Sequence, residues 1–172
     1  RFVGWIDPLA QSFLVDEVGG VFLTSVDLFF GTKDTTIPVT VQIQEMVNGY
    51  PAPRIVPFST KTLNPTSVNV SNDGTTATTF TFDSPVYLEE NKEYCFVVIS
   101  MCNTYQVYGS RMGEKTLDGT RTVSRQPYAG VLFKSQNGST YTADQNEDLK
   151  FTVKKAAFTT GTTSTVTLSN DS

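Results

Sequence analysis

The side chains best suited to acid-base chemistry in this chain are carboxylates. Two facing carboxyl groups are what most glycosidases use to cleave a sugar bond, and several acidic residues could supply them: Glu45, Glu89-Glu90, Asp144 and Glu147-Asp148. Glu89-Glu90 is followed by Asn91 and Lys92, which is typical of a solvated turn. Asp144 and Glu147-Asp148 could also bind calcium through oxygen, but they lack a ligand loop of fixed spacing, so we expect a solvated surface.

The sequence lacks the residues that other common catalytic centres require. The chain contains no histidine, the usual general base of serine and cysteine nucleophiles and the commonest zinc ligand. Neither a Gly-x-Gly-x-x-Gly motif nor a Gly-Lys-Ser/Thr phosphate loop occurs. Cys95 and Cys102 alone cannot build a zinc site, and we expect both to be reduced. We therefore expect that the protein is not an enzyme and that it has neither a cofactor nor a metal site.

Charge and hydropathy exclude two further classes of partner. The formal net charge is −4 and the basic residues are scattered, whereas nucleic-acid binding needs a concentrated basic surface. No apolar run approaches the roughly 20 residues that span a bilayer. We expect neither nucleic-acid binding nor membrane insertion.

Aromatic residues offer a different chemistry, because sandwich lectins stack sugar rings on exposed aromatic side chains. Six lie in or beside predicted loops: Trp5, Tyr50, Tyr105, Tyr108, Tyr128 and Tyr141. Tyr and Trp are equally common at the edge of a hydrophobic core, so both roles stay open. The predicted contacts with a ligand or partner are Tyr50, Pro53, Tyr105, Tyr108, Arg111 and Tyr128.

The elements that position these residues are predicted to be strands. A low charged fraction of 17%, with many Thr and Val residues, favours strands over helices. Residues 21–30 alternate, with Phe22, Val26, Leu28 and Phe30 expected on the core face and Ser25 and Asp27 opposite. Further strands are predicted at 39–43 and 79–82, where the side chains also alternate, and at 94–99, 105–108, 131–133 and 149–153. Residues 94–99 are apolar on both faces, which predicts a central strand.

Turns and loops complete the predicted fold. Asn48-Gly49 and residues 72–74 indicate turns, and Pro85 should end the strand at 79–82. Four prolines predict that residues 49–67 form a loop or an irregular edge segment, and residues 109–126 read as a second long excursion. The expected fold is an all-β, antiparallel two-sheet sandwich, jelly-roll-like, with about eight strands. It should occupy residues 1–158, followed by a Thr/Ser-rich linker at 159–172.

Three strings carry a resemblance to a known family. They are residues 7–13 (DPLAQSF), residues 85–90 (PVYLEE) followed by 94–97 (YCFV), and residues 126–137 (QPYAGVLFKSQN). They resemble baseplate wedge and tail structural proteins of contractile-tailed marine phages, especially cyanophages. The resemblance implies a virion protein assembled in the host cytoplasm, with other tail or baseplate proteins as partners and an oligomeric state. It carries over no catalytic residues, and with the missing initiator Met it suggests a module of a longer polypeptide.

The functional expectation is a non-catalytic structural domain of a phage tail or baseplate. Protein-protein contacts are expected through the loops at 49–67 and 109–128. The alternative is a module that binds carbohydrate, such as a host-surface glycan, because the same fold serves lectins.

Overall fold

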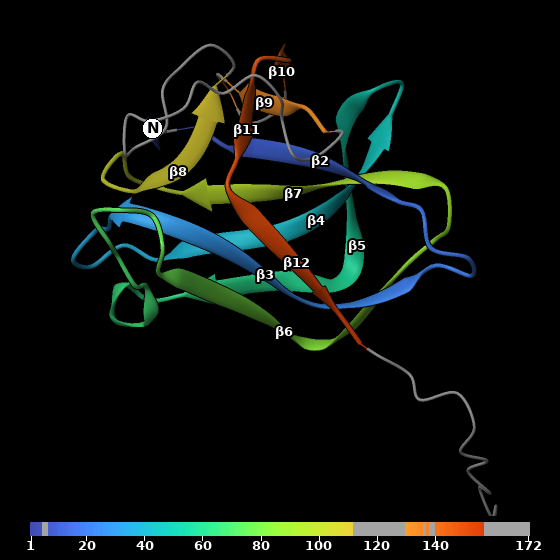
Figure 1. Cartoon of the computed structure of the whole chain (residues 1–172), viewed down its shortest axis with the longest axis horizontal. Helices are drawn as coiled ribbons and strands as arrows, with labels where there is room; N and C mark the ends of the chain where they lie inside the picture. Colours follow the sequence, from blue (N-terminus) through green and yellow to red (C-terminus); the bar gives the residue numbers. More distant parts are fainter. Residues whose placement is uncertain (5–6, 112–129, 136, 138–139, 157–172) are drawn as a thin grey trace, which may run out of the picture.

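The computed structural model describes residues 1–4, 7–111, 130–135, 137 and 140–156 (Figure 1). Twelve strands and one short 3₁₀ helix form the described part: β1 (Phe2–Gly4), β2 (Leu9–Val15), β3 (Val21–Thr32), β4 (Val39–Val47), β5 (Tyr50–Leu63), η1 (Pro65–Ser67), β6 (Ala77–Leu88), β7 (Lys92–Ser100), β8 (Gln106–Arg111), β9 (Leu132–Ser135), β10 (Tyr141–Asp144), β11 (Glu147–Leu149) and β12 (Phe151–Lys155). None of the described helical segments is long and apolar enough to cross a membrane. The predicted linker at 159–172 lies outside the described residues.

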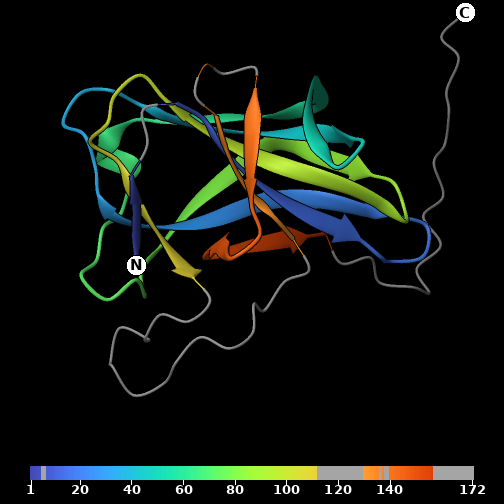
Figure 2. The same cartoon turned by 90° about the horizontal axis from the view of Figure 1, so that it is seen from above.

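The strands form two antiparallel sheets that pack face to face, with β3 and β12 in one layer and β4 and β7 in the other (Figure 2). Sheet I has the order β1-β8-β3-β12, with β6 also paired to β3 and β11 to β8. Sheet II has the order β10-β9-β2-β7-β4-β5. The chain crosses between sheets from β2 to β3 and again from β3 to β4, as in jelly-roll sandwiches. The predicted two-sheet sandwich is confirmed, although it has more strands than the eight expected.

The main core lies between the sheets and follows the predicted alternation. Leu28 and Phe30 from β3 and Val41 and Ile43 from β4 are completely buried. Burying each such side chain contributes about 1.5–3 kcal/mol of stability.

The predicted central strand is β7, which lies between β2 and β4 in sheet II. Phe96 and Val98 point into the main core. Cys95 and Val97 join a smaller cluster of buried residues with Ala10 and Phe133. Both cysteines are free, as predicted, and burial raises the pKa of the Cys95 thiol to about 12.

Phe22 does not lie on the core face that the alternation predicted. The pairing between β3 and β6 shifts register between Leu23 and Ser25. Because side chains alternate along a strand, such an irregularity moves Leu23 into the core and leaves Phe22 38% exposed. The Phe22 ring instead packs against Tyr87 of β6, with ring centroids 5.2 Å apart.

The edge-segment alternative predicted for residues 49–67 is confirmed, whereas the strand end predicted at Pro85 is wrong. Residues 50–63 form the 14-residue strand β5, and β6 continues through Pro85 to Leu88. Among the described strands, β5 pairs only with β4 and β6 only with β3. A proline lacks a backbone N–H, which an edge strand tolerates because one side of its ladder is open.

Candidate functional site

Two of the predicted contact residues are core residues. Tyr105 is fully buried, and its hydroxyl donates to the Ile37 carbonyl, while desolvation raises its pKa to about 12. Tyr108 is 2% exposed and donates to the Ser71 carbonyl at 2.8 Å. The prediction that these side chains contact a partner is therefore wrong, because each is enclosed by its own domain.

Two more lie outside what the structure describes. The backbone of Arg111 pairs with Glu147 in the β8–β11 ladder, but its side chain is outside the described part. Tyr128 and Trp5 are also outside the described residues, as is most of the predicted loop at 109–128. The contact prediction for these residues stays a prediction.

The remaining two, Tyr50 and Pro53, are exposed and lie on the same strand, β5. Tyr50 is about half exposed, and one side of its ring packs on Phe133 with centroids 5.7 Å apart. The sixth aromatic candidate, Tyr141, is partly buried beside the same cluster. Of the two alternatives predicted for this segment, a loop or an irregular edge segment, the structure shows the second, with one side of the strand exposed.

The middle of β5 departs from regular pairing in a large bulge. Gln42 pairs with Thr60 and Gln44 with Ile55, so two steps along β4 correspond to five along β5. Such an irregularity interrupts the ladder and redirects the side chains of the strand that carries the extra residues.

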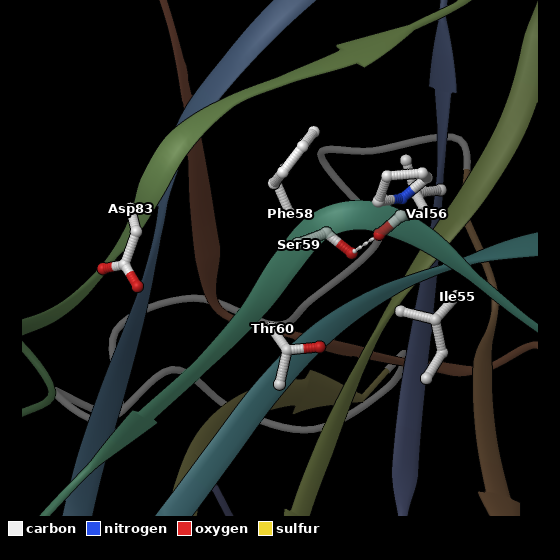
Figure 3. Close-up of a pocket in the computed structure, with 7 residues that line it drawn as sticks. Ile55, Val56, Phe58, Ser59, Thr60 and Asp83 are labelled. Atoms are coloured by element: carbon white, nitrogen blue, oxygen red, sulfur yellow. Dashed lines mark hydrogen bonds between the residues drawn. The ribbon is translucent and has the colours of Figure 1, made fainter.

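Ser59 holds this bulge from the inside. Its side chain is buried, and its hydroxyl donates to the Val56 carbonyl at 2.6 Å, the bond drawn in Figure 3. The same hydroxyl oxygen accepts from the Ile43 N–H at 3.2 Å. Val56 packs into the main core beneath. The bulge is therefore tied both to itself and to the neighbouring strand.

Phe58 is the residue that the bulge projects. Its φ is +65°, in the left-handed region that bulky residues rarely adopt and that costs about 1–2 kcal/mol. Its side chain is 72% exposed, so burial of the ring within this domain does little to offset that cost. Backbone strain of this kind is concentrated at functional sites.

A hollow of about 260 Å³ lies beside Phe58. Seven residues line it: Ile55, Val56, Pro57, Phe58, Ser59, Thr60 and Asp83. Asp83 comes from β6, so the hollow lies where the edge of sheet I approaches the edge of sheet II (Figure 3). Lys61 joins the same two edges through an ion pair with Asp83, with Nζ 2.9 Å from Oδ1.

Two well-exposed charged residues belong to the two strands that line the hollow, Arg54 to β5 and Asp83 to β6. The Arg54 side chain is 80% exposed and lies 3.8 Å from Glu45, and the Asp83 side chain is 86% exposed. Figure 3 places Asp83 and Ile55 on opposite sides of Phe58. We call Ile55, Pro57, Phe58 and Asp83 the bulge surface. Among the residues that line the hollow, Asp83 has the one ionisable side chain. The hollow is therefore better suited to binding than to acid-base catalysis.

The acidic residues near the C-terminal strands form a different arrangement from the solvated surface expected. Glu147 and Asp148 are 2% and 1% exposed. The Nζ atom of Lys134 lies 2.6 Å from the Glu147 carboxylate and 3.7 Å from the Asp144 carboxylate. The positive charge beside these two carboxylates is therefore the ammonium group of Lys134. Within the described ranges, no group of three or more metal-ligating side chains is close enough to hold an ion.

The Glu89-Glu90 segment is the turn that the sequence predicted. Residues 89–91 connect β6 to β7, and Asn91 has a φ of +56°. The Glu90 carboxylate accepts from the Gly19 N–H at 2.8 Å, which ties this turn to the one after β2.

Sequence patterns did not identify Phe58. An exposed phenylalanine resembles a core residue in sequence, and nothing in the pattern marks its positive φ. The one available signal was the density of prolines between 51 and 57, which marked the edge of the sheet but not the bulge.

Comparisons with family models, with curated proteins and with solved structures found no match to this chain.

Proposed function

We propose that this chain is a non-catalytic structural domain that binds a protein partner through the bulge surface. The observation that carries the proposal is Phe58, whose strained backbone presents a 72% exposed aromatic ring. The buried Ser59 hydrogen bonds maintain that geometry. A strained backbone that exposes a large apolar group is consistent with a role outside the domain.

The surface favours a protein over a sugar as the partner. A lectin site needs an exposed aromatic face beside converging polar groups, whereas the hollow is lined mainly by apolar side chains. The half-exposed Tyr50 ring contacts the Phe133 ring at a tilt, with centroids 5.7 Å apart. Partly buried apolar pockets next to an exposed aromatic residue are typical of hot spots in protein interfaces.

The edge position of the bulge surface also favours a defined contact. Pro51, Pro53 and Pro57 remove N–H donors from the edge of β5, which opposes uncontrolled pairing with strands of other chains. A partner would therefore be recognised through side chains. A component of a large assembly needs such selectivity because many other sheet edges are nearby.

The resemblance of residues 7–13, 85–90, 94–97 and 126–137 to tail and baseplate proteins supports a virion as the setting. In this proposal the domain is part of a phage tail or baseplate, and its partners are other chains of that assembly. A sandwich with a selective edge suits such a structural role.

Site-specific photocrosslinking in assembled particles tests the proposal. We would replace Phe58 with benzoylphenylalanine in the full-length protein, irradiate intact particles and identify crosslinked chains by mass spectrometry. The matched control places the same crosslinker at Thr152, which is exposed on β12. We expect a protein-protein product from position 58 and none from position 152. Products from neither position, or equally from both, would overturn the proposal.

A further inference from the structure

The tip of the β4–β5 hairpin crosses the outer face of sheet II. Strands β5 and β10 are the two edges of this sheet, with β4, β7, β2 and β9 between them, yet β5 comes close to β10. Tyr50, the first residue of β5, contacts Phe133 of β9, and their ring centroids are 5.7 Å apart. Figure 1 shows the tip of the hairpin rising towards β9. We call residues 46–54 the strap.

A small apolar cluster lies on the face that the strap crosses. Its members are buried and come from three neighbouring strands of sheet II: Ala10, Cys95, Val97 and Phe133. Residues next to them in the chain belong to the main core, so the alternation of side chains along a strand places the cluster on the outer face: Leu9, Phe96, Val98 and Leu132. Met46 of the strap packs against the cluster. Without a cover, this cluster would be an exposed hydrophobic patch.

The strap is joined to the rest of the hairpin by an interrupted ladder. The pairing of β4 with β5 shifts register on both sides of Gln44. The prolines at 51, 53 and 57 cannot donate a backbone hydrogen bond. The bulge that Ser59 holds lies at the base of the strap. A segment with so few ladder bonds is one that opens locally, because local stability follows the contacts and bonds that a segment makes.

The base of the strap is held more firmly than its tip. Glu45 forms an ion pair with Lys92 of β7, at 3.2 Å, and its other carboxylate oxygen lies 3.8 Å from Arg54. The tip is held by the contact of Tyr50 with Phe133 and by Met46. The loss of one aromatic pair changes an equilibrium by only about two- to tenfold.

We infer that the strap is a hinged cover, which lifts from the outer face of sheet II about the bulge of β5 while the two sheets stay folded. In the closed state the apolar cluster is shielded from solvent and from other chains. In the open state the cluster forms an apolar surface on the outside of the sandwich. This device is separate from the partner binding proposed for the bulge surface, because it needs no second molecule.

Cys95 reports the opening directly, because its thiol belongs to the covered cluster. Its Sγ atom lies 3.7 Å from the Gln44 carbonyl oxygen, and it forms no disulfide. In a Cys102→Ser background, Cys95 is the single thiol of the chain. A small methanethiosulfonate reagent modifies it when the cover lifts, and intact mass spectrometry gives the rate.

The dependence of this rate on urea distinguishes local from global opening. The slope of a free energy against denaturant scales with the surface that becomes exposed, and lifting the strap exposes little. Below the unfolding transition we therefore expect a rate that hardly changes with urea and exceeds the rate that global unfolding allows. A rate that follows the full urea dependence of global unfolding would overturn the inference.

Two tyrosine substitutions test the role of the strap itself. Tyr50→Ala should raise the urea-independent rate by about two- to tenfold, because it removes the ring contact that holds the tip. Tyr87→Ala is the matched control: Tyr87 is also about half exposed and also contacts a phenylalanine, Phe22, but it lies on β6 of sheet I. The control should leave that rate unchanged.

Urea unfolding of each variant separates a change in global stability from a change in the strap. Equal acceleration by the two substitutions, or none from Tyr50→Ala, would show that the strap does not control access to Cys95. The labelling rate of the parent tests the inference even if a variant fails to fold. None of these outcomes depends on the crosslinking result at position 58.

Discussion

Gln11 and Asp148 join the two sheets of the sandwich through a buried hydrogen bond. The Gln11 Nε2 atom of β2 donates to Asp148 Oδ1 of β11 at 2.9 Å, and Gln11 Oε1 accepts from the Leu149 N–H at 2.9 Å. The second carboxylate oxygen of Asp148 is buried without a hydrogen-bond partner in the described part of the chain. Desolvation raises the pKa of Asp148 from 3.8 to about 6.

This raised pKa predicts that Asp148→Asn stabilises the protein at neutral pH. The folded state holds the proton more tightly than the unfolded state, so the stabilising contribution is complete below about pH 3.8 and is lost as the pH rises through about 6. Asparagine keeps the shape and carries no charge. We expect the free energy of unfolding at pH 7 to rise by about 1–3 kcal/mol.

Urea denaturation of both proteins at pH 7 and pH 4.5 measures this effect. The advantage of the variant should shrink at the lower pH, where Asp148 is protonated in the folded protein. A variant that is less stable than the parent at pH 7 would show that the charged carboxylate is satisfied in the native state.

The contribution of Asp34 to folding stability should depend on pH in the opposite direction to that of Asp148. Its Oδ2 atom accepts from the N–H groups of Ile37 at 2.7 Å and Thr36 at 2.8 Å, and its Oδ1 accepts from the Thr104 hydroxyl at 2.8 Å. These bonds, the one from Ile37 first, hold the pKa of Asp34 well below its usual value. The contribution to stability is present above about pH 3.8 and is lost as the pH falls further.

Thermal unfolding of Asp34→Asn between pH 7 and pH 2.5 checks this sign. The variant should unfold at a lower temperature than the parent at pH 7, and the difference should narrow in acid. Equal melting temperatures of the two proteins at pH 7 would mean that the negative charge of Asp34 does not stabilise the segment at residues 34–37.

Ser59→Ala should destabilise the domain, because it removes a buried hydroxyl that bonds the Val56 carbonyl and the Ile43 N–H. An unsatisfied buried polar group costs about 1–3 kcal/mol. Thr60→Ala, at the next, exposed position of the same strand, is the control and should change stability by less than about 0.5 kcal/mol. Chemical denaturation measures both, and equal effects would mean that Ser59 does not hold the bulge.

Phe58→Gly should separate stability from binding. Glycine adopts a positive φ without strain, so the free energy of unfolding should stay the same or rise by up to about 1 kcal/mol, although a large side chain is lost. The same substitution removes the projecting ring and should abolish the partner binding proposed for the bulge surface. Asn91→Gly, at another positive φ, is the control and should leave that binding intact. A marked loss of stability in Phe58→Gly would show that the ring serves the fold of its own domain.

The regular parts of the fold could be predicted because their side chains alternate without interruption. Val39, Val41 and Ile43 are buried as their spacing predicted. Phe22 was misplaced because a register shift leaves no mark in the sequence. The prolines of β5 left a loop and an irregular edge segment as alternatives, because a proline is excluded from a central strand but tolerated at an edge, and only the pairing decides between the two.

The candidate site could be predicted only as a segment. Tyr50 and Pro53 lie on the strand that carries the bulge, whereas Tyr105 and Tyr108 are enclosed by the core. Tyrosine suits a surface and a core edge equally, so residue type alone could not separate the two cases. The role of Phe58 depends on a backbone angle that only the three-dimensional structure shows.

The position of β7 has a consequence for how the domain opens. Its residues Cys95–Val98 are buried on both faces, and the strand pairs with β2 on one edge and β4 on the other. Amide protons in such a strand exchange with solvent only when the whole domain unfolds. Local fluctuations at the outer edges, the bulge of β5 included, should leave these protons in place. Deuterium uptake in β7 would then report the global stability of the sandwich in the assembled state, without denaturant.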